Sequence, residues 1–143
     1  MNRPIYENDQ SRADEERIAG IVAERWKCNV HRMPRLYELD YLAERDGKTT
    51  CFLEIKCRNK VKFGIYEDFT ISLAKAMIAL AFTDNTGLPV FFVIEFSGGI
   101  YWTQLVRHVT VRLGGRADRN DPDDQEPMAC IPWQSFKLLK GEK

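Results

Sequence analysis

The sequence has no apolar stretch near the length of about 20 residues that a helix needs to cross a lipid bilayer. Its longest apolar runs, Ala76–Phe82 and Leu88–Ile94, are far shorter. The first residues, Met1–Gln10, are polar and charged, and they lack the apolar segment of an export signal. We therefore expect no membrane partner and a cytoplasmic location.

Side chains for a soft metal site are also scarce, since the chain has only four cysteines and two histidines. The cysteines are scattered and lack the close pairing that marks a zinc site. Neither histidine has a recognisable nucleophile or acidic partner, so nucleophilic catalysis has little support. We expect reduced and mostly buried thiols. The four cysteines are Cys28, Cys51, Cys57 and Cys130, and the two histidines are His31 and His108.

An excess of either charge sign is missing too, because 21 Lys and Arg residues balance 21 Asp and Glu residues. The field of the whole protein therefore provides no general attraction to nucleic acid. A local cluster exists in Lys56–Lys62, which is either a solvated charged loop or a phosphate-binding segment. The candidate DNA-binding residues are Arg58, Lys60, Lys62 and Arg35, with Arg32 as a further possibility.

The 143 residues suffice for one domain with its own core, but not for a catalytic domain beside a separate recognition domain. We therefore expect a single domain over residues 1–143. Residues 1–10 are expected to be flexible. Residues 114–127 are rich in Gly, Asp and Pro, which predicts an exposed and mobile loop.

Hydrophobic periodicity predicts the order helix, hairpin, helix, strands and small helix. The apolar run 90–96 has the length and character of a central strand that is covered on both faces. The fold class is therefore α/β, with a central mixed β-sheet flanked by helices. The other predicted elements are helices over 11–26 and 67–82, a basic loop over 60–66, one or two strands within 100–113, an edge strand over 128–131 and a short terminal helix over 133–140.

Residues 36–44 and 49–57 form a predicted hairpin around the turn signal Asp46-Gly47. A three-residue loop centred on Gly47 places Asp40 directly opposite Glu54. A two-residue loop places Leu53 opposite Asp40 and turns Glu54 to the other face. The apolar pattern favours the first register, because that register puts six apolar side chains on the buried face. These are Leu39, Tyr41, Ala43, Cys51, Leu53 and Ile55.

Glu54 and Lys56 are two residues apart on a strand, so their side chains leave the same face. In the favoured register the Cβ atoms of Asp40 and Glu54 lie about 4.5 to 5.5 Å apart. Two such carboxylates repel unless a cation lies between them, and their oxygen atoms suit Mg²⁺, for which Mn²⁺ substitutes. The ion would activate water and stabilise charge on a phosphate, while Lys56 would act as base or electrostatic stabiliser. The pattern predicts phosphodiester hydrolysis.

Two segments, Tyr-Glu-Leu-Asp-Tyr-Leu at 37–42 and Phe-Leu-Glu-Ile-Lys at 52–56, resemble the PD-(D/E)xK signature of restriction-endonuclease-like nucleases. That superfamily includes small phage nucleases and archaeal Holliday-junction resolvases. The proline that leads the family's motif is absent before Asp40. The resemblance implies a restriction-endonuclease-like core and an enzyme of a bacterial or phage-infected host cell.

The resemblance also implies roles for the two helices. The family's first helix often supplies a Glu to the metal site, a place that Glu16 matches, with Glu15 and Glu24 as alternatives. The helix after the motif often carries a Lys that faces the site, which Lys75 matches. A helix-dipole role for Glu16 and a solvated helix face for Lys75 explain these residues equally well. Resolvase-like members act as dimers, so a homodimer is expected.

The resulting hypothesis is a Mg²⁺-dependent DNA nuclease, structure-directed in the manner of an endonuclease or junction resolvase. The alternative is a non-catalytic nucleic-acid-binding or assembly protein with the same fold. The predicted metal ligands are Asp40, Glu54 and Glu16, and the predicted catalytic residues are these three with Lys56 and Lys75.

Overall fold

The computed structural model describes residues 9–107, 109–115 and 125–141. Two α-helices, two short 3₁₀ helices and nine strands occur in this part of the chain. Their bounds are α1 Asp9–Trp26, β1 Asn29–Arg32, η1 Arg35–Tyr37, β2 Tyr41–Arg45, β3 Lys48–Lys62, β4 Phe69–Ser72, α2 Leu73–Thr86, β5 Val90–Ser97, β6 Gly99–Gln104, β7 Thr110–Gly115, β8 Gln125–Ile131, η3 Trp133–Ser135 and β9 Lys137–Gly141. Within the described residues, no helix combines the length and the apolar character needed to cross a membrane.

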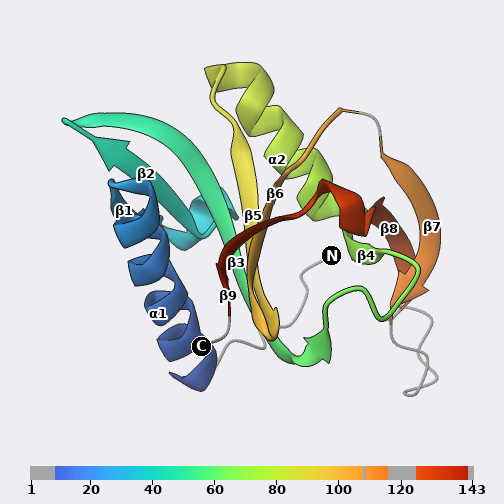
Figure 1. Ribbon diagram of the computed structural model, residues 1–143. Coiled ribbons are helices and arrows are strands. Elements are labelled where there is room, and N and C mark those ends of the chain that lie inside the picture. The colour runs from blue at the N-terminus through green and yellow to red at the C-terminus, as the bar shows by residue number, and fades with distance from the viewer. Residues whose placement is uncertain (1–8, 108, 116–124, 142–143) are drawn as a thin grey trace.

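The strands form two sheets, one of six strands in the order β1-β2-β3-β5-β6-β9 and one of three strands in the order β4-β8-β7. The larger sheet is mixed, because β3 and β5 run parallel while its other neighbours are antiparallel. In Figure 1, α1 lies on one side of this sheet, and α2 lies on the other side with the smaller sheet. The predicted α/β class, with a mixed sheet flanked by helices, is confirmed.

Both faces of the large sheet are covered, which explains the continuous apolar run of β5. Phe92, Ile94 and Phe96 alternate toward α2 and the small sheet, where they join Ala76 and Ala129. Val93 faces the opposite way and joins the core beneath α1. The other buried members of that core are Ile18, Ala19, Val22, Tyr41, Ala43, Cys51, Leu53, Ile55 and Ile100.

The β2–β3 hairpin turns at Asp46 and Gly47, whose positive φ angles of 55° and 79° are those of the two-residue type I′ turn. This loop is the shorter of the two alternatives, so the predicted three-residue loop is wrong. The pairing nevertheless shifts at a β-bulge, because Glu44 pairs with Thr49 while Ala43 pairs with Cys51.

The bulge restores the register that the longer loop would have given. Thr50 is the extra residue, and its hydroxyl donates a hydrogen bond of 3.3 Å to the carbonyl oxygen of Ala43. Beyond the bulge Tyr41 pairs with Leu53, so the next position outward, Asp40, comes opposite Glu54. The relative placement of these two acidic residues therefore agrees with the favoured register, although the loop length does not.

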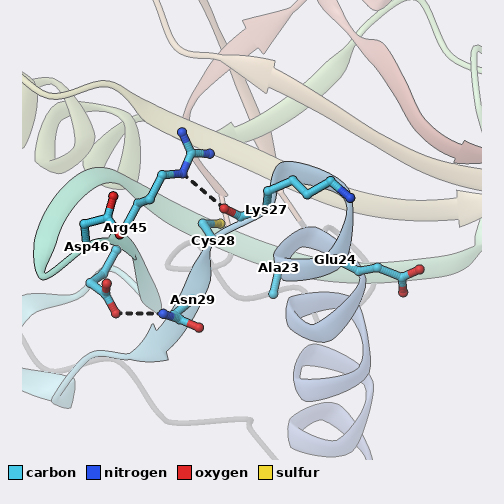
Figure 2. A pocket seen from close by; sticks show the side chains of 8 residues that line it. Ala23, Glu24, Lys27, Cys28, Asn29, Arg45 and Asp46 are labelled. Atoms are coloured by element: carbon cyan, nitrogen blue, oxygen red, sulfur yellow. Dashed lines mark hydrogen bonds between the residues drawn. The ribbon is translucent and has the colours of Figure 1, made fainter.

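The hairpin is fixed to the end of α1 by Arg45, as Figure 2 shows in part. The Arg45 guanidinium donates hydrogen bonds to the carbonyl oxygens of Trp26, at 2.6 Å, and Lys27, at 3.1 Å. These carbonyls lie where a helix leaves its last acceptors unsatisfied, so a cation is favourable there. The contact fixes the position of β2 and β3 relative to α1.

Leu39 does not share a face with Tyr41 and Ala43, which corrects the sequence prediction. It packs with Phe52 and Phe92 on the α2 side, whereas Tyr41 and Ala43 face α1. The reason is that β2 begins only at Tyr41. The preceding η1 turn and the left-handed Glu38, with φ 62°, interrupt the alternation before the strand starts.

Two predictions around the second helix are wrong in their bounds. The basic segment does not leave the sheet at residue 60, because β3 continues to Lys62. The helix begins at Leu73 and extends to Thr86, while Phe69–Ser72 form the strand β4. Phe69 pairs with Ile131, a residue far away in the sequence, and helical spacing alone does not reveal such a partner.

The C-terminal part differs most from the prediction. β8 lies in the centre of the small sheet instead of at its edge, and the predicted terminal helix is reduced to η3. Residues 137–141 instead form β9, which pairs with β6 and is an edge strand of the large sheet. Within the predicted mobile loop 114–127, residues 114–115 and 125–127 belong to β7 and β8. Residues 9 and 10 of the predicted flexible N-terminus belong to α1, and the predictions for residues 1–8 and 116–124 lie outside the described residues.

Candidate active site

Glu54 lies in the middle of β3 and is almost completely buried, with 1% of its surface exposed. Its neighbours along the strand, Leu53 and Ile55, point into the core beneath α1. Because side chains alternate along a strand, Glu54 points to the opposite face, the side of α2. An acidic side chain thus lies in an interior that apolar residues otherwise fill, and an acidic group is seldom fully buried without a partner.

Two lysines from different elements meet this carboxylate. Lys56 Nζ lies 3.5 Å from Glu54 Oε1, and Lys75 Nζ lies 3.4 Å from the same oxygen. Lys56 comes from the same strand two residues later, whereas Lys75 comes from the first turn of α2. Lys75 therefore faces Glu54, the orientation that the family resemblance implied.

Asp40 reaches the same place from the residue just before β2. The backbone N–H of Ile55 donates a hydrogen bond of 3.4 Å to Asp40 Oδ2, which holds the side chain against β3. The carbonyl oxygen of Asp40 accepts a 2.8 Å hydrogen bond from the N–H of Met33, so its backbone is fixed as well. The structure therefore brings together Asp40, Glu54, Lys56 and Lys75.

The surroundings of Glu54 change its acidity. Burial raises the pKa of Glu54 to about 7, and the negative charge of Asp40 contributes in the same direction. The ammonium groups of Lys56 and Lys75 act against this shift, since a nearby positive charge favours the ionised carboxylate. Carboxyl groups that take up and release a proton near neutral pH are common in functional sites.

One oxygen of Glu54 receives no hydrogen bond from a nitrogen donor. Oε1 contacts both lysines, whereas Oε2 is buried and accepts no hydrogen bond. Orphaned polar atoms of this kind are uncommon in folded proteins, and a bound ion is one of the groups that can satisfy them. The donor set fits a hard divalent cation, because Asp40 and Glu54 offer carboxylate oxygens and no sulfur or imidazole ligand.

Glu16 is not part of this group in the structure. Its carboxylate Oε1 accepts a hydrogen bond of 3.0 Å from Arg32 Nε, and Arg32 Nη1 also lies 3.7 Å from Glu15 Oε1. Arg32 further contacts the hydroxyl of Tyr41. In the ranges 9–107, 109–115 and 125–141, no three Asp, Glu, His or Cys side chains lie close enough together to hold an ion. The predicted ligand set of three carboxylates is therefore not assembled.

A backbone carbonyl beside the site had no counterpart in the sequence analysis. Lys75 Nζ donates a hydrogen bond to the carbonyl oxygen of Glu38, the residue that ends the η1 turn. This contact joins α2 to the segment that leads into Asp40. No side-chain pattern announces it, because the accepting atom belongs to the main chain.

The predicted DNA-binding residues lie on exposed parts of two elements. Arg58, Lys60 and Lys62 lie on the final part of β3 beyond Lys56, and Arg35 lies in η1. In the described part of the chain, no carboxylate forms an ion pair with any of these four side chains. Arg32, in contrast, is engaged by Glu15, Glu16 and Tyr41 and is less available to a phosphate.

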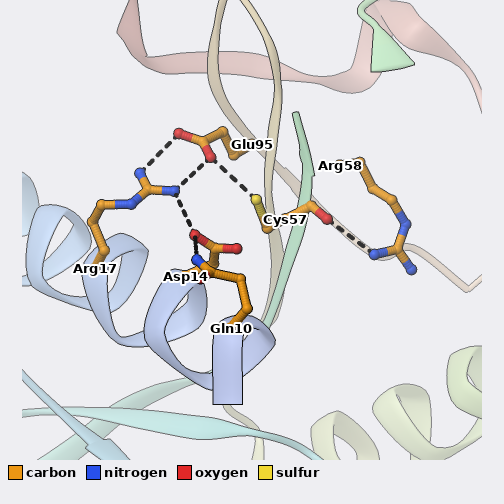
Figure 3. Close-up of polar contacts among 6 residues, drawn as sticks. All are labelled: Gln10, Asp14, Arg17, Cys57, Arg58 and Glu95. Carbon is orange, nitrogen blue, oxygen red and sulfur yellow. Dashed lines mark hydrogen bonds and ion pairs between the residues drawn. The ribbon is translucent and has the colours of Figure 1, made fainter. Parts of the chain in front are cut away.

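A second polar cluster lies on the α1 side of the sheet, as Figure 3 shows. Glu95 accepts hydrogen bonds of 2.9 and 2.7 Å from Arg17 and one of 3.2 Å from the thiol of Cys57. Arg17 also pairs with Asp14 one turn earlier in α1. The hydrogen bond from Arg17 lowers the pKa of Glu95. Every charge in this cluster has a partner, so we assign it to the attachment of α1 to β5.

A family model described as "Phage putative PDDEXK endonuclease" matches residues 1–139 of the chain. A comparison with curated proteins finds no match. The family match covers both strands of the hairpin, α1 and α2, and so includes every residue of the site described above. The sequence resemblance to the PD-(D/E)xK superfamily is confirmed, and the chain belongs to the phage PDDEXK endonuclease family.

Proposed function

We propose that the chain is a Mg²⁺-dependent deoxyribonuclease that hydrolyses phosphodiester bonds, with Mn²⁺ as an effective substitute. The observation that carries the proposal is the state of the Glu54 carboxylate. It is buried, one oxygen contacts two lysines, the other receives no hydrogen bond from a nitrogen donor, and Asp40 lies beside it. An apolar side chain would fill this place at lower cost, so a buried carboxylate here points to a function.

Asp40 and Glu54 are the residues that would hold the cation. When bound, a divalent ion neutralises the two carboxylates, polarises a water molecule and stabilises the charge that develops on the phosphate. The backbone N–H of Ile55 holds the Asp40 carboxylate against β3. Lys75 orients Glu54 from α2 and fixes the η1 turn through the Glu38 carbonyl oxygen.

Lys56 is the residue best placed to act on the substrate. Its side chain is 39% exposed while its ammonium group contacts Glu54, so it lies between the buried carboxylate and solvent. As the water oxygen bonds to phosphorus and the bond to the leaving sugar oxygen breaks, negative charge accumulates on the phosphate. A cation at this position offsets that charge and orients the attacking water.

DNA would be held by its phosphates rather than read by its sequence. The exposed cations Arg58, Lys60, Lys62 and Arg35 suit contacts with the backbone, which carry no sequence information. Structure-directed cleavage, at ends or branches, follows from such contacts better than cleavage at a long specific site. A homodimer belongs to the same proposal, and sedimentation of the purified chain measures it directly.

The test compares wild type with Asp40→Asn and Glu54→Gln on linear duplex, single-stranded and four-way-junction DNA. Each substrate is incubated with Mg²⁺, with Mn²⁺ or with a chelator. We expect both variants to lose at least a hundredfold in cleavage rate, the size expected when a group that stabilises the transition state is removed. Asp84→Asn is the matched control, because Asp84 pairs with Arg107 near the far end of α2.

Three outcomes discriminate between the assignments. Full cleavage by Glu54→Gln, or by chelated wild type, would remove the proposed mechanism. Binding of DNA by wild type without cleavage in any metal would favour the non-catalytic protein of the same fold. Glu16→Gln tests whether Glu16 leaves Arg32 to bind metal. A loss of Mg²⁺ affinity comparable with that of Asp40→Asn, measured by calorimetry, would make Glu16 a ligand.

A further inference from the structure

The η1 turn presents two large apolar side chains to solvent immediately before Asp40. Leu36 is 84% exposed and Tyr37 is 49% exposed. Neither belongs to the side chains that pack on the core beneath α1 or on the core beneath α2. Single exposed apolar residues are common on proteins, but two in succession beside a candidate active site point to a binding role.

The turn that carries them is held firmly against the site. The N–H of Tyr37 donates to the carbonyl oxygen of Pro34 at 3.1 Å, and the N–H of Glu38 donates to that of Arg35 at 3.2 Å. Lys75, which contacts Glu54, also donates to the carbonyl oxygen of Glu38. Glu38 has a left-handed backbone with φ 62°, a conformation that is unfavourable for residues other than glycine. The fold therefore maintains a strained turn that places Leu36 and Tyr37 outside the core.

The surroundings of the pair favour a nucleic-acid occupant. Arg35 precedes Leu36 and is exposed, and the ammonium groups of Lys56 and Lys75 lie at the site that the turn borders. Proteins bind single-stranded nucleic acid with cations and aromatic rings together, since the cations hold phosphates and the rings stack on bases. A base offers its face to such a ring only when it is not stacked within an intact duplex.

We propose that Leu36 and Tyr37 contact nucleobases next to the cleaved phosphate and thereby select DNA with unpaired nucleotides at that point. This inference rests on the proposed nuclease function and adds its substrate class. Single strands, frayed ends and branch points share the required feature, which is a base free to leave the helical stack. Tyr37 supplies the stacking face, and Leu36 fills the space that an unstacked neighbour leaves.

The test measures kcat/KM on single-stranded DNA, on a perfect duplex and on the same duplex with an unpaired segment. We expect Tyr37→Ala to lower cleavage of single-stranded and unpaired substrates by roughly five- to a hundredfold, the fold-change that corresponds to losing one base–aromatic stacking contact. Cleavage of the perfect duplex should change by less than about twofold. Tyr37→Phe keeps the ring and should remain near wild type on all substrates.

Leu36→Ser should act in the same direction as Tyr37→Ala. Leu113→Ser is its matched control, because Leu113 is 70% exposed but lies on β7 in the small sheet. An equal loss on all three substrates, or no loss on any, would overturn the inference. So would a dimer that becomes monomeric only in the Leu36→Ser and Tyr37→Ala variants, since the pair would then bind a second copy. A wild type that cleaves none of the substrates would instead refute the nuclease proposal itself.

Discussion

Glu54 and Glu95 lie on the neighbouring strands β3 and β5, yet their surroundings change acidity in opposite directions. The pKa of Glu54 is raised to about 7, chiefly by burial and next by Asp40. The pKa of Glu95 is lowered, chiefly by its hydrogen bond from Arg17. Glu95 thus stabilises the fold as a charged group, whereas Glu54, in spite of its two lysine contacts, does so only when it is protonated or when a divalent cation is bound.

This contrast predicts opposite pH dependences for two substitutions in the metal-free chain. The unfolded carboxyl of Glu54 ionises near pH 4.5 and the folded one near pH 7, so the folded state holds more protons between these values. The free energy of unfolding therefore falls as pH rises through this window, by an amount on the order of 3 kcal/mol. Glu54→Gln removes this loss, so its advantage over wild type grows from pH 4.5 to 7 and is constant above.

Glu95→Gln is the control of opposite sign. Because the pKa of Glu95 is depressed in the folded chain, its carboxylate stabilises the fold at pH values above the pKa of the unfolded chain. This stabilisation is lost as pH falls through the pKa of the folded chain. The variant should be less stable than wild type at pH 7, with a gap that closes in acid. Urea unfolding with chelator at several pH values measures both effects. A Glu54→Gln advantage in the free energy of unfolding that does not depend on pH would contradict the raised pKa.

Mg²⁺ at pH 8 should stabilise wild type but not Glu54→Gln.

Among the elements, the β2–β3 hairpin determines whether the two carboxylates meet. Ala43 and Cys51 are paired with seven residues between them, and an odd number cannot form a two-residue turn and regular pairs alone. The unpaired residue must be placed in the loop or in a bulge, and the structure places it at Thr50. Both solutions bring Asp40 opposite Glu54, so the bulge lies between the turn and the site without determining the site.

A pair of one-residue changes tests this interpretation. Deletion of Thr50 leaves six residues between Ala43 and Cys51, which a two-residue turn and regular pairs accommodate. Cleavage should therefore stay within about tenfold of wild type, with a stability loss near the 1 kcal/mol of one hydrogen bond. Insertion of one alanine between Asp40 and Tyr41 moves Asp40 by one position and turns its side chain to the other face. Cleavage and Mg²⁺ binding should then be lost in a folded protein.

The two measurements are cleavage rate and calorimetric Mg²⁺ titration, with circular dichroism to establish folding. A folded insertion variant that still binds Mg²⁺ would show that Asp40 is not a ligand. A folded Thr50 deletion that loses Mg²⁺ binding would show that the bulge itself shapes the site.

The same hairpin shows how far the sequence determines the fold. The face and partner of Glu54 followed from period-two alternation and parity, which are local properties. The location of the extra residue did not, because a bulge and a longer loop satisfy the same pattern. For Glu16, helix position alone did not reveal that Arg32, on the strand beside α1, binds its carboxylate.

The errors at residues 69–72 and in the C-terminal part have a different cause. Residues 69–72 and 137–141 have apolar spacings compatible with a helix, and both become strands through partners far away in the chain. Phe69 pairs with Ile131, and Tyr101 pairs with Leu138. β-pairing depends on tertiary context more than helix formation does, so a single sequence indicates such strands poorly.

For the whole molecule, a formal net charge of zero means that attraction to DNA must come from a limited region. The positively charged residues along β3 differ in their surroundings. Lys56 contacts the buried Glu54, whereas Arg58, Lys60 and Lys62 follow it on the exposed end of the strand. Together with Arg35 of η1, these are the four exposed cations that we propose as the DNA-contacting basic surface. Its size sets the salt dependence of binding.

Each phosphate neutralised on duplex DNA contributes about −0.9 to the slope of log K against log salt concentration. Four contacts therefore predict a slope of about −3 to −4. Fluorescence anisotropy across a series of KCl concentrations measures this slope, and the Asp40→Asn variant is used so that the DNA is not cleaved. Lys60→Ala and Lys62→Ala should each reduce the magnitude of the slope by about 0.9. Lys48→Ala is the matched control, because Lys48 is exposed at the opposite end of the same strand, beside the hairpin turn. An equal reduction by Lys48→Ala would place the DNA over the hairpin instead. A slope near zero would mean that the basic surface does not bind phosphate.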